Sequence, residues 1–317
     1  MTVFRASQCL GTVLLLVLGS ACTQAPDSRT ETSSQTLFNR QPDFGDPLQG
    51  LSASDLARFE AGQDEFTDVE TVADGLGPVF NEASCAACHV GPNGAIGGTN
   101  QRLETRFGFR NSFTGKFGWK AQVPSLFVFS GDAYLNEMGI TNPIFPKENC
   151  PQGNCALLAA NPVPTLNDDG TGVEAFNDFM TLLAPPPRGS QSFQTDRGND
   201  VARAIGCLDC HVQTLQTGRN AVRALDQVFY HPFSDFLLHD MGQLGDGITQ
   251  NQATGRLMRT QPLWGLRTQT LMLHDGSATT ITDAILAHDG QARDSRRRFE
   301  RLGTFDRGAL LAFLKSL

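Results

Sequence analysis

The stretch Cys85-Ala86-Ala87-Cys88-His89 recurs later in the chain as Cys207-Leu208-Asp209-Cys210-His211. In the pattern C-x-x-C-H, two thiols bond covalently to the vinyl groups of a haem, and the histidine is held under the iron as its proximal ligand. The sequence therefore predicts two covalent c-type haems, with His89 and His211 as iron ligands. The alternative is a zinc site in which the four cysteines converge on one metal. That arrangement leaves both histidines without a role.

The first residues are typical of an export signal. Arg5 is followed by the apolar run 10–18, which is too short to span a bilayer, and then by Gly19, Ser20 and Ala21. We expect a signal peptide over residues 1–21, cleavage after Ala21 and a periplasmic protein. Cys22, the first residue after cleavage, is a candidate lipid anchor. Ordinary secretion without lipidation is the alternative.

The remaining cysteines and the net charge indicate the redox compartment and the kind of partner. Cys150 and Cys155 lie close together and outside the two repeated motifs, so in an oxidising compartment they are expected to form a local disulfide. The formal net charge is −8, which argues against nucleic acid as a partner. An acidic surface is compatible with docking to a small basic redox protein that donates electrons.

The pattern along the chain predicts a mainly α-helical fold with two cytochrome c-like haem domains rich in loops. Residues 22–50 are polar and rich in Pro, Gly and Ser, which predicts a flexible tether. We expect an N-terminal haem domain over 51–195 and a C-terminal cytochrome c domain over 196–317. Helices are expected from the Ser52/Asp55 capping pattern to about Phe66, over 201–206, over 282–287 and over 306–317.

Several short stretches together carry a resemblance to the di-haem oxidoreductase family, which is related to the bacterial di-haem cytochrome c peroxidases. These stretches are Gly75–Asn81, Phe117–Ala121, Asn136–Thr141, Phe233–Phe236, Leu237–Gly242, Arg259–Trp264, Leu273–Ser277 and Ile285–His288. The resemblance covers about residues 51–317. It implies a peroxidase-like oxidoreductase that uses a small oxidant such as hydrogen peroxide. A calcium ion lies between the domains in that superfamily, but no ligand cluster for it is recognisable here.

The resemblance also implies a sixth ligand for the second haem. In the superfamily this ligand lies fourteen residues after the histidine of a His-Asp-Gly motif, and here that count leads from His274 to His288. Methionine is commoner at this place, so a His211/His288 pair is a departure that lowers the reduction potential. The alternative is that His288 only binds carbonyl groups at a helix end.

Around the first haem, Glu137-Met138 resembles the Glu-Met pair beside the peroxidatic haem of the superfamily. This resemblance gives Glu137 an acid/base role. Met138 could instead be the sixth iron ligand, which would close the site. Trp264, more than Trp119, is a candidate electron relay between the haems, although tryptophan most often serves core packing. We therefore expect a reactive haem at His89 and an electron-transfer haem at His211. The alternative is a non-catalytic di-haem electron carrier.

Overall fold

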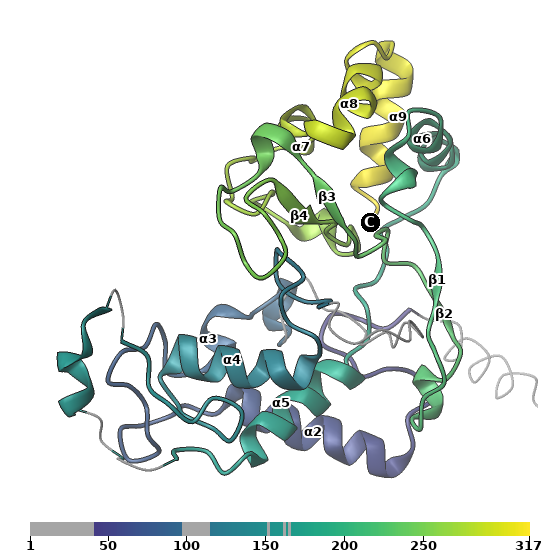
Figure 1. The fold of residues 1–317 in the computed structure, drawn as a ribbon. Coiled ribbons are helices and arrows are strands. Elements are labelled where there is room, and N and C mark those ends of the chain that lie inside the picture. The colour runs from purple at the N-terminus through teal and green to yellow at the C-terminus, as the bar shows by residue number, and fades with distance from the viewer. Residues whose placement is uncertain (1–40, 97–114, 151–152, 161–162, 164–165) are drawn as a thin grey trace, which may run out of the picture. The chain divides into compact units, whose positions relative to one another are not determined.

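The computed structural model describes residues 41–96, 115–150, 153–160, 163 and 166–317. The described chain is mainly helical with long irregular connections, as predicted (Figure 1). Its paired strands are short: β1 (Leu215–Gln216) pairs with β2 (Phe229–Tyr230), and β3 (Leu238–Asp240) pairs with β4 (Leu257–Arg259), both antiparallel. The predicted signal peptide over 1–21 and the candidate anchor Cys22 lie outside the described residues.

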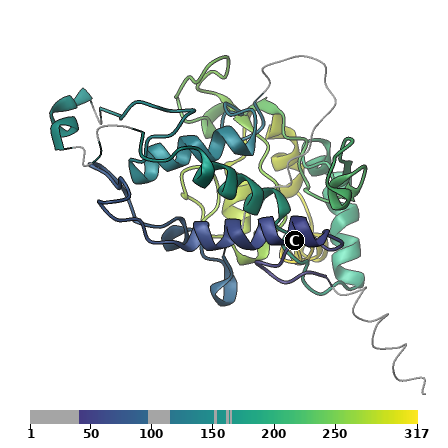
Figure 2. The ribbon, with the colours of Figure 1, turned by 90° about the horizontal axis from the view of Figure 1, so that it is seen from below.

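The first haem motif lies beside a pair of packed helices. Helix α2 (Ala53–Thr67) is capped by Ser52, whose Oγ accepts the backbone N–H of Asp55 at 3.1 Å, so the predicted start is confirmed. Helix α5 (Thr171–Leu182) runs past α2 in both views (Figures 1 and 2). A Cβ on Gly62 would lie 2.3 Å from the carbonyl oxygen of Ala175, so only glycine permits this close approach.

The core of this part of the chain consists of aromatic and aliphatic side chains from α2, α5 and helix α4 (Leu126–Met138). Its buried members include Phe59, Phe66, Tyr134, Met138, Phe176, Phe179 and Leu182. The half-buried side chain of Cys85 packs against this cluster. The first haem motif is therefore fixed to a hydrophobic core on one side.

The second haem motif follows the first helix of a similar pair. Helix α6 (Phe193–Ala204) begins with a capping box between Ser192 and Thr195 and leads into Cys207. It packs against α9 (Thr304–Leu314), as Figure 1 shows. A Cβ on Gly198 would lie 2.1 Å from the carbonyl oxygen of Ala309, so glycine again sets the approach of the two helices. The helix predicted over 306–317 is therefore confirmed as α9, whereas the one predicted over 201–206 is the end of a longer helix that begins at Phe193 and stops at Ala204.

Two shorter helices complete this half. Helix α7 (Ile281–Ala287) ends at His288, and helix α8 (Arg293–Glu300) follows. Ile281 and Ile285 of α7 pack against the buried cluster of α6 and α9. A third cluster contains Leu225, Tyr230 and Trp264.

The folded part of the chain begins earlier than Leu51, so the predicted tether over 22–50 is wrong for its last ten residues. The backbone N–H of Leu48 donates to Leu182 O at 2.8 Å, and the Arg267 guanidinium lies 4.9 Å from the centre of the Phe44 ring. The predicted boundary between residues 195 and 196 falls inside α6. A division into two haem domains stays a prediction, and it would lie in the irregular segment 184–192.

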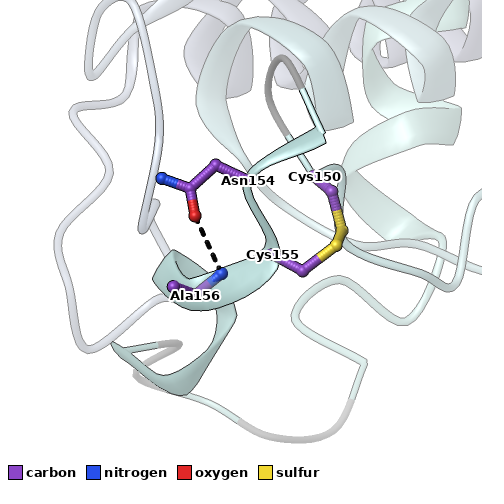
Figure 3. The surroundings of a disulfide bond; sticks show 4 residues. All are labelled: Cys150, Asn154, Cys155 and Ala156. Atoms are coloured by element: carbon purple, nitrogen blue, oxygen red, sulfur yellow. Dashed lines mark hydrogen bonds between the residues drawn. A yellow bond between two sulfur atoms is a disulfide. The ribbon is translucent and has the colours of Figure 1, made fainter.

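Cys150 and Cys155 form a disulfide bond, which confirms the predicted pairing (Figure 3). The adjacent Asn154 side chain accepts the backbone N–H of Ala156 at 3.1 Å, where the short 3-10 helix Cys155–Ala160 begins. The bond therefore anchors the start of this turn to the preceding loop. Within the described part of the chain, no helix has the length and apolar character needed to cross a membrane.

Candidate haem-binding sites

The two C-x-x-C-H motifs fold into similar tight turns. The first forms the short helix α3 (Cys85–Cys88), and the second forms a 3-10 turn over Cys207–Asp209. In each motif the backbone N–H of the histidine donates to the carbonyl of the first cysteine at 3.0 Å. Two unrelated stretches of sequence thus present two thiols and one imidazole in matching order.

The four motif thiols are free and do not converge on one point. In the described residues, only Cys210, Asp235 and His239 form a group of three side chains that could hold a metal ion. The single zinc site held by four cysteines is therefore excluded. Burial raises the pKa of Cys85 to about 12 and that of Cys207 to about 11, so both start as neutral thiols set against apolar side chains.

His211 and His288, the pair to which the fourteen-residue count leads, lie close together, and their joint ligation of iron stays a prediction. Their ring centres lie 6.5 Å apart. An imidazole nitrogen lies about 2 Å from the metal it ligates, which puts two rings on opposite sides of one metal with centres about 6 Å apart. Burial lowers the pKa of His211 to about 4 and also lowers the pKa of His288. Both rings are therefore neutral at physiological pH, as iron ligation requires.

Hydrogen bonds fix which nitrogen each ring offers. His211 Nδ1 lies 2.9 Å from Phe233 O, and His288 Nδ1 lies 2.7 Å from Ala284 O. A carbonyl only accepts, so both Nδ1 atoms carry the proton and both Nε2 atoms keep a free lone pair. The bond to Ala284 is the helix-end interaction considered as the alternative role of His288. It is compatible with iron ligation, because the two roles use different nitrogens.

The segment that follows Pro232 holds His211, the candidate proximal histidine. Sequence reasoning missed this contact. Phe233 supplies the carbonyl for His211, the Ser234 N–H donates to Val212 O at 3.0 Å, and the Asp235 N–H donates to Cys210 O at 2.9 Å. Phe233 has a φ of +52°, an uncommon value for a residue with a Cβ. The only sequence signal was the stretch Phe233–Phe236, which carried the family resemblance without a role.

His239 lies beside the second motif, at the edge where a thiol would bond to haem. Its Nδ1 is 4.0 Å from Cys210 Sγ, and its Nε2 donates to Asp235 Oδ2 at 2.8 Å. This hydrogen bond fixes the His239 ring relative to the Asp235 carboxylate. Because Cys210 belongs to the haem motif, we assign this trio to the wall of the second site and not to a separate metal.

Asp289 fixes the turn that follows His288. This buried carboxylate accepts the N–H of Gln243 at 3.2 Å and the Nε of Arg293 at 2.8 Å. The Arg293 side chain lowers the pKa of Asp289 well below its ordinary value. Arg296 lies 3.9 Å from the same carboxylate. Part of the arginine run on α8 thus serves to position the helix end that carries His288.

Around the first motif, the structure brings the predicted Glu-Met pair close to the haem peptide. Met138 is buried, with its Sδ 3.9 Å from Cys85 Sγ. Glu137 is exposed, accepts a hydrogen bond from the Asn81 side chain, and its charge acts on His89. His89 is also exposed, and its ring contacts Phe66 with centres 6.0 Å apart. This ring contact of His89 is with an apolar side chain and not with a second histidine.

The two tryptophans occupy different environments. Trp264 is buried against Tyr230, with ring centres 6.1 Å apart. Val222 packs against both this cluster and the cluster that holds Cys85, while the neighbouring Leu263 packs against the cluster around Cys207. The cluster that contains Trp264 therefore adjoins the core beside the first motif through Val222, and Leu263 links the next position along the chain to the core beside the second motif. Trp119 is 39 % exposed, and its ring centre lies 6.3 Å from that of His274.

The chain has some similarity to solved structures. A MauG-like protein associated with microbial copper homeostasis has 16 % identity and a TM-score of 0.43, with 88 % of this chain and 93 % of that chain covered. The diheme peroxidase BthA from Burkholderia thailandensis E264 has 16 % identity and a TM-score of 0.46, with 88 % and 89 % covered. Kuenenia stuttgartiensis hydrazine synthase has 18 % identity and a TM-score of 0.46, with 97 % and 100 % covered. These values are too low to establish a shared fold.

No curated protein matches the sequence. Residues 109–317 match the family described as "Di-haem oxidoreductase, putative peroxidase". The matched region contains the second haem motif and His288, together with Glu137 and Trp264. It begins after the first motif, which the C-x-x-C-H pattern and its matching turn identify independently. The chain therefore belongs to the di-haem oxidoreductase family.

Proposed function

We propose that the protein is a periplasmic di-haem c-type cytochrome with peroxidase-like oxidoreductase activity. The haem held by Cys85, Cys88 and His89 is the reactive one. The haem held by Cys207, Cys210 and His211 transfers electrons. The observation that carries this proposal is the asymmetry between the two sites, since one has two opposed imidazoles and the other has a single exposed one.

The second site has the residues of a closed electron-transfer centre. His211 and His288 approach from opposite elements, each with Nδ1 engaged and Nε2 free. Two strong nitrogen ligands would leave no position for an oxidant. The hydrogen bond between Asp235 and His239, and the turn fixed by Asp289, support this geometry. Rigid ligands of this kind suit a site whose coordination must stay the same in both oxidation states.

The first site differs because its neighbouring side chains are a carboxylate and a thioether. A haem bound at His89 supplies an iron that can exchange electrons with a peroxide. Glu137 Oε2 is engaged by Asn81, which orients the carboxylate and leaves Oε1 to accept a proton from a bound oxidant and return it. The carboxylate is exposed, so its proton can be replaced from water.

Met138 is better placed as a packing partner than as an iron ligand. Cys85 would attach a haem covalently, whereas Met138 as a sixth ligand would have to reach the iron. The Met138 Sδ lies 3.9 Å from Cys85 Sγ, within the same buried cluster, which favours packing beside the attachment point. This position supports an open coordination site at the first haem. The alternative function, a non-catalytic di-haem carrier, needs Met138 or another side chain to close that site.

Trp264 is the proposed relay between the two haems. Its ring is buried. Val222 packs against both the Trp264 cluster and the cluster beside Cys85, and Leu263, next to Trp264 in the sequence, packs against the cluster beside Cys207. Electrons from a small redox protein would then enter at the second haem and reach the first. The net charge of −8 supports a basic donor protein. Export through residues 1–21, with Cys22 as lipid anchor, completes the proposal.

The first experiment distinguishes an open first site from a closed one. Reduced protein is titrated with carbon monoxide and followed by its Soret absorption. We expect one haem in two to bind carbon monoxide. If neither haem binds it, and if protein pre-reduced at the second haem does not turn over peroxide, the electron-carrier function is the better one.

The second experiment tests the acid/base role of Glu137. Glu137→Gln keeps the size and the acceptor for Asn81 but cannot shuttle a proton, so peroxide turnover should fall about 10²–10⁴-fold. Glu82→Gln is the matched control, because Glu82 is also an exposed glutamate close to the first motif. Haem content should be unchanged in both variants. Equal turnover in the two variants would show that Glu137 has no role in the reaction.

A further inference from the structure

A buried tyrosine and a glutamate form a hydrogen-bonded pair next to the first haem motif. Tyr134 lies on α4 and is 5 % exposed. Its hydroxyl donates to Glu70 Oε1. Phe176 makes an edge-on contact with the Tyr134 ring at 4.9 Å between ring centres, and the charges of Glu65 and Asp168 also act on Tyr134. The phenol proton is therefore hydrogen-bonded to a carboxylate, that of Glu70.

The pair is tied directly to the haem peptide. The Glu70 backbone N–H donates to Ala83 O at 2.8 Å, two residues before Cys85. Tyr134 lies one helical turn before Met138, in the buried cluster against which Cys85 packs. The charge of Glu70 contributes to the raised pKa of Cys85. The three observations place the hydroxyl–carboxylate pair at the edge of the first haem site.

The choice of a carboxylate is informative. A buried tyrosine needs a hydrogen-bond partner, but a backbone carbonyl or an amide would serve at lower cost than a half-buried charge. Burial raises the pKa of Glu70, which makes it a better proton acceptor than an exposed glutamate. Burial and the same carboxylate raise the pKa of Tyr134, so the phenol stays protonated in the resting protein. Such a phenol can lose an electron readily only if its proton leaves with it.

We infer that Tyr134 and Glu70 form a proton-coupled redox pair that supplies an electron to the first haem after a peroxide has oxidised it. Tyr134 loses one electron to that haem, and its phenolic proton moves to Glu70. The peroxide is the oxidant, and it takes two electrons and two protons to become two water molecules. One electron comes from Tyr134 through the first haem, the other comes from the pre-reduced second haem, and solvent supplies the two protons. An electron from the donor protein and the proton held by Glu70 then restore the phenol. This inference rests on the proposed reactivity of the first haem.

The chain contains two tyrosines, so one substitution is enough to assign a tyrosyl radical to its residue. The second, Tyr230, belongs to the cluster with Trp264 and not to the core around Cys85. Tyr230→Phe therefore leaves Tyr134 as the sole source of a tyrosyl radical without any change near the first motif. Growth on ring-deuterated tyrosine identifies the radical in protein that carries no substitution at Tyr134.

Protein with its second haem pre-reduced is mixed with hydrogen peroxide and frozen within milliseconds, and electron paramagnetic resonance spectra are recorded. We expect a tyrosyl signal that narrows with ring-deuterated tyrosine, persists in Tyr230→Phe and disappears in Tyr134→Phe. Glu70→Gln keeps an acceptor but takes no proton, so the radical should form about 10²-fold more slowly. Haem absorption and circular dichroism check that each variant is folded and loaded.

The outcomes separate this inference from the proposed function. If peroxide is consumed and Tyr230→Phe shows no deuterium-sensitive tyrosyl signal, the redox role of Tyr134 is wrong while the peroxidase function stands. An unchanged rate of radical formation in Glu70→Gln overturns the role of Glu70 as proton acceptor. If peroxide does not react with the haems at all, both the inference and the proposed function fail.

Discussion

Replacing Gly198 with alanine should destabilise the half of the protein that carries the second haem motif. Gly198 lies where α6 crosses α9, and a Cβ there would lie 2.1 Å from Ala309 O and 2.5 Å from the Cβ of Phe313. The first of these contacts is with backbone, so the helices must move apart to relieve it. Because α6 leads directly into Cys207, the displacement reaches the haem peptide.

The expected magnitude follows from two opposing effects. Overpacking a close helix contact costs about 1–3 kcal/mol, and the 2.1 Å contact with backbone indicates the upper end of that range. Alanine in place of glycine inside a helix contributes up to about 1 kcal/mol of stability. The net loss in the free energy of unfolding should therefore be about 2 kcal/mol.

Gly308→Ala is the matched control, because Gly308 lies on α9 and its nearest atom within 4 Å is the far end of the Gln194 side chain, at 4.0 Å. It should gain about 1 kcal/mol from helix propensity alone. Urea unfolding followed by circular dichroism and by Soret absorption measures both variants. Equal midpoints for the two alanine variants would refute the contact between α6 and α9 as the reason for the glycine.

Three further predictions concern the haem sites and their surroundings. His288→Gly should open the second iron, so the reduced variant binds carbon monoxide at that haem, and an unchanged spectrum would leave His288 with only its helix-end role. Both haems should stay attached after denaturation in acid acetone, and Cys88→Ala or Cys210→Ala should each disturb one of them, whereas haem extracted from the unmodified protein would disprove covalent attachment. Burial raises the pKa of Glu65 above its ordinary value of 4.5, so the folded state keeps a proton there that the unfolded chain has lost. The stability from this proton is present below pH 4.5 and is lost as the pH rises through the raised pKa, and Glu65→Gln should flatten this part of the pH profile of unfolding midpoints.

The features that could be predicted from the sequence are those that depend on neighbours along the chain. The haem motifs, the Ser52 cap, the helix before Cys207 and the disulfide all fall in this group, because each is specified within a few residues. The opposition of His211 and His288 is different, since it came from a count carried by the family resemblance. Periodicity within the sequence would not have revealed it.

The features that sequence reasoning missed depend on contacts between distant segments. The carbonyl of Phe233 holds His211 across a loop with no regular pattern, and Glu70 meets Tyr134 across 64 positions of sequence. The docking of residues 41–50 was missed for a related reason. Their polar composition hides Phe44 and Leu48, two apolar side chains whose packing partners lie far along the chain.

The difference between the two haem sites comes from the residues at the ends of two helices. In the second half, α7 ends at His288, and this imidazole faces His211 because Ala284 and the Asp289 turn hold it there. In the first half, α4 ends at Glu137 and Met138, beside Cys85. The thioether of Met138 is turned into the core, and the carboxylate of Glu137 is exposed to solvent. A helix end that offers an imidazole favours a closed iron, whereas one that offers a carboxylate beside a single exposed histidine favours chemistry at the iron. A simple electron carrier has no need of this difference, and the difference therefore supports the proposal that the reactive site is at His89.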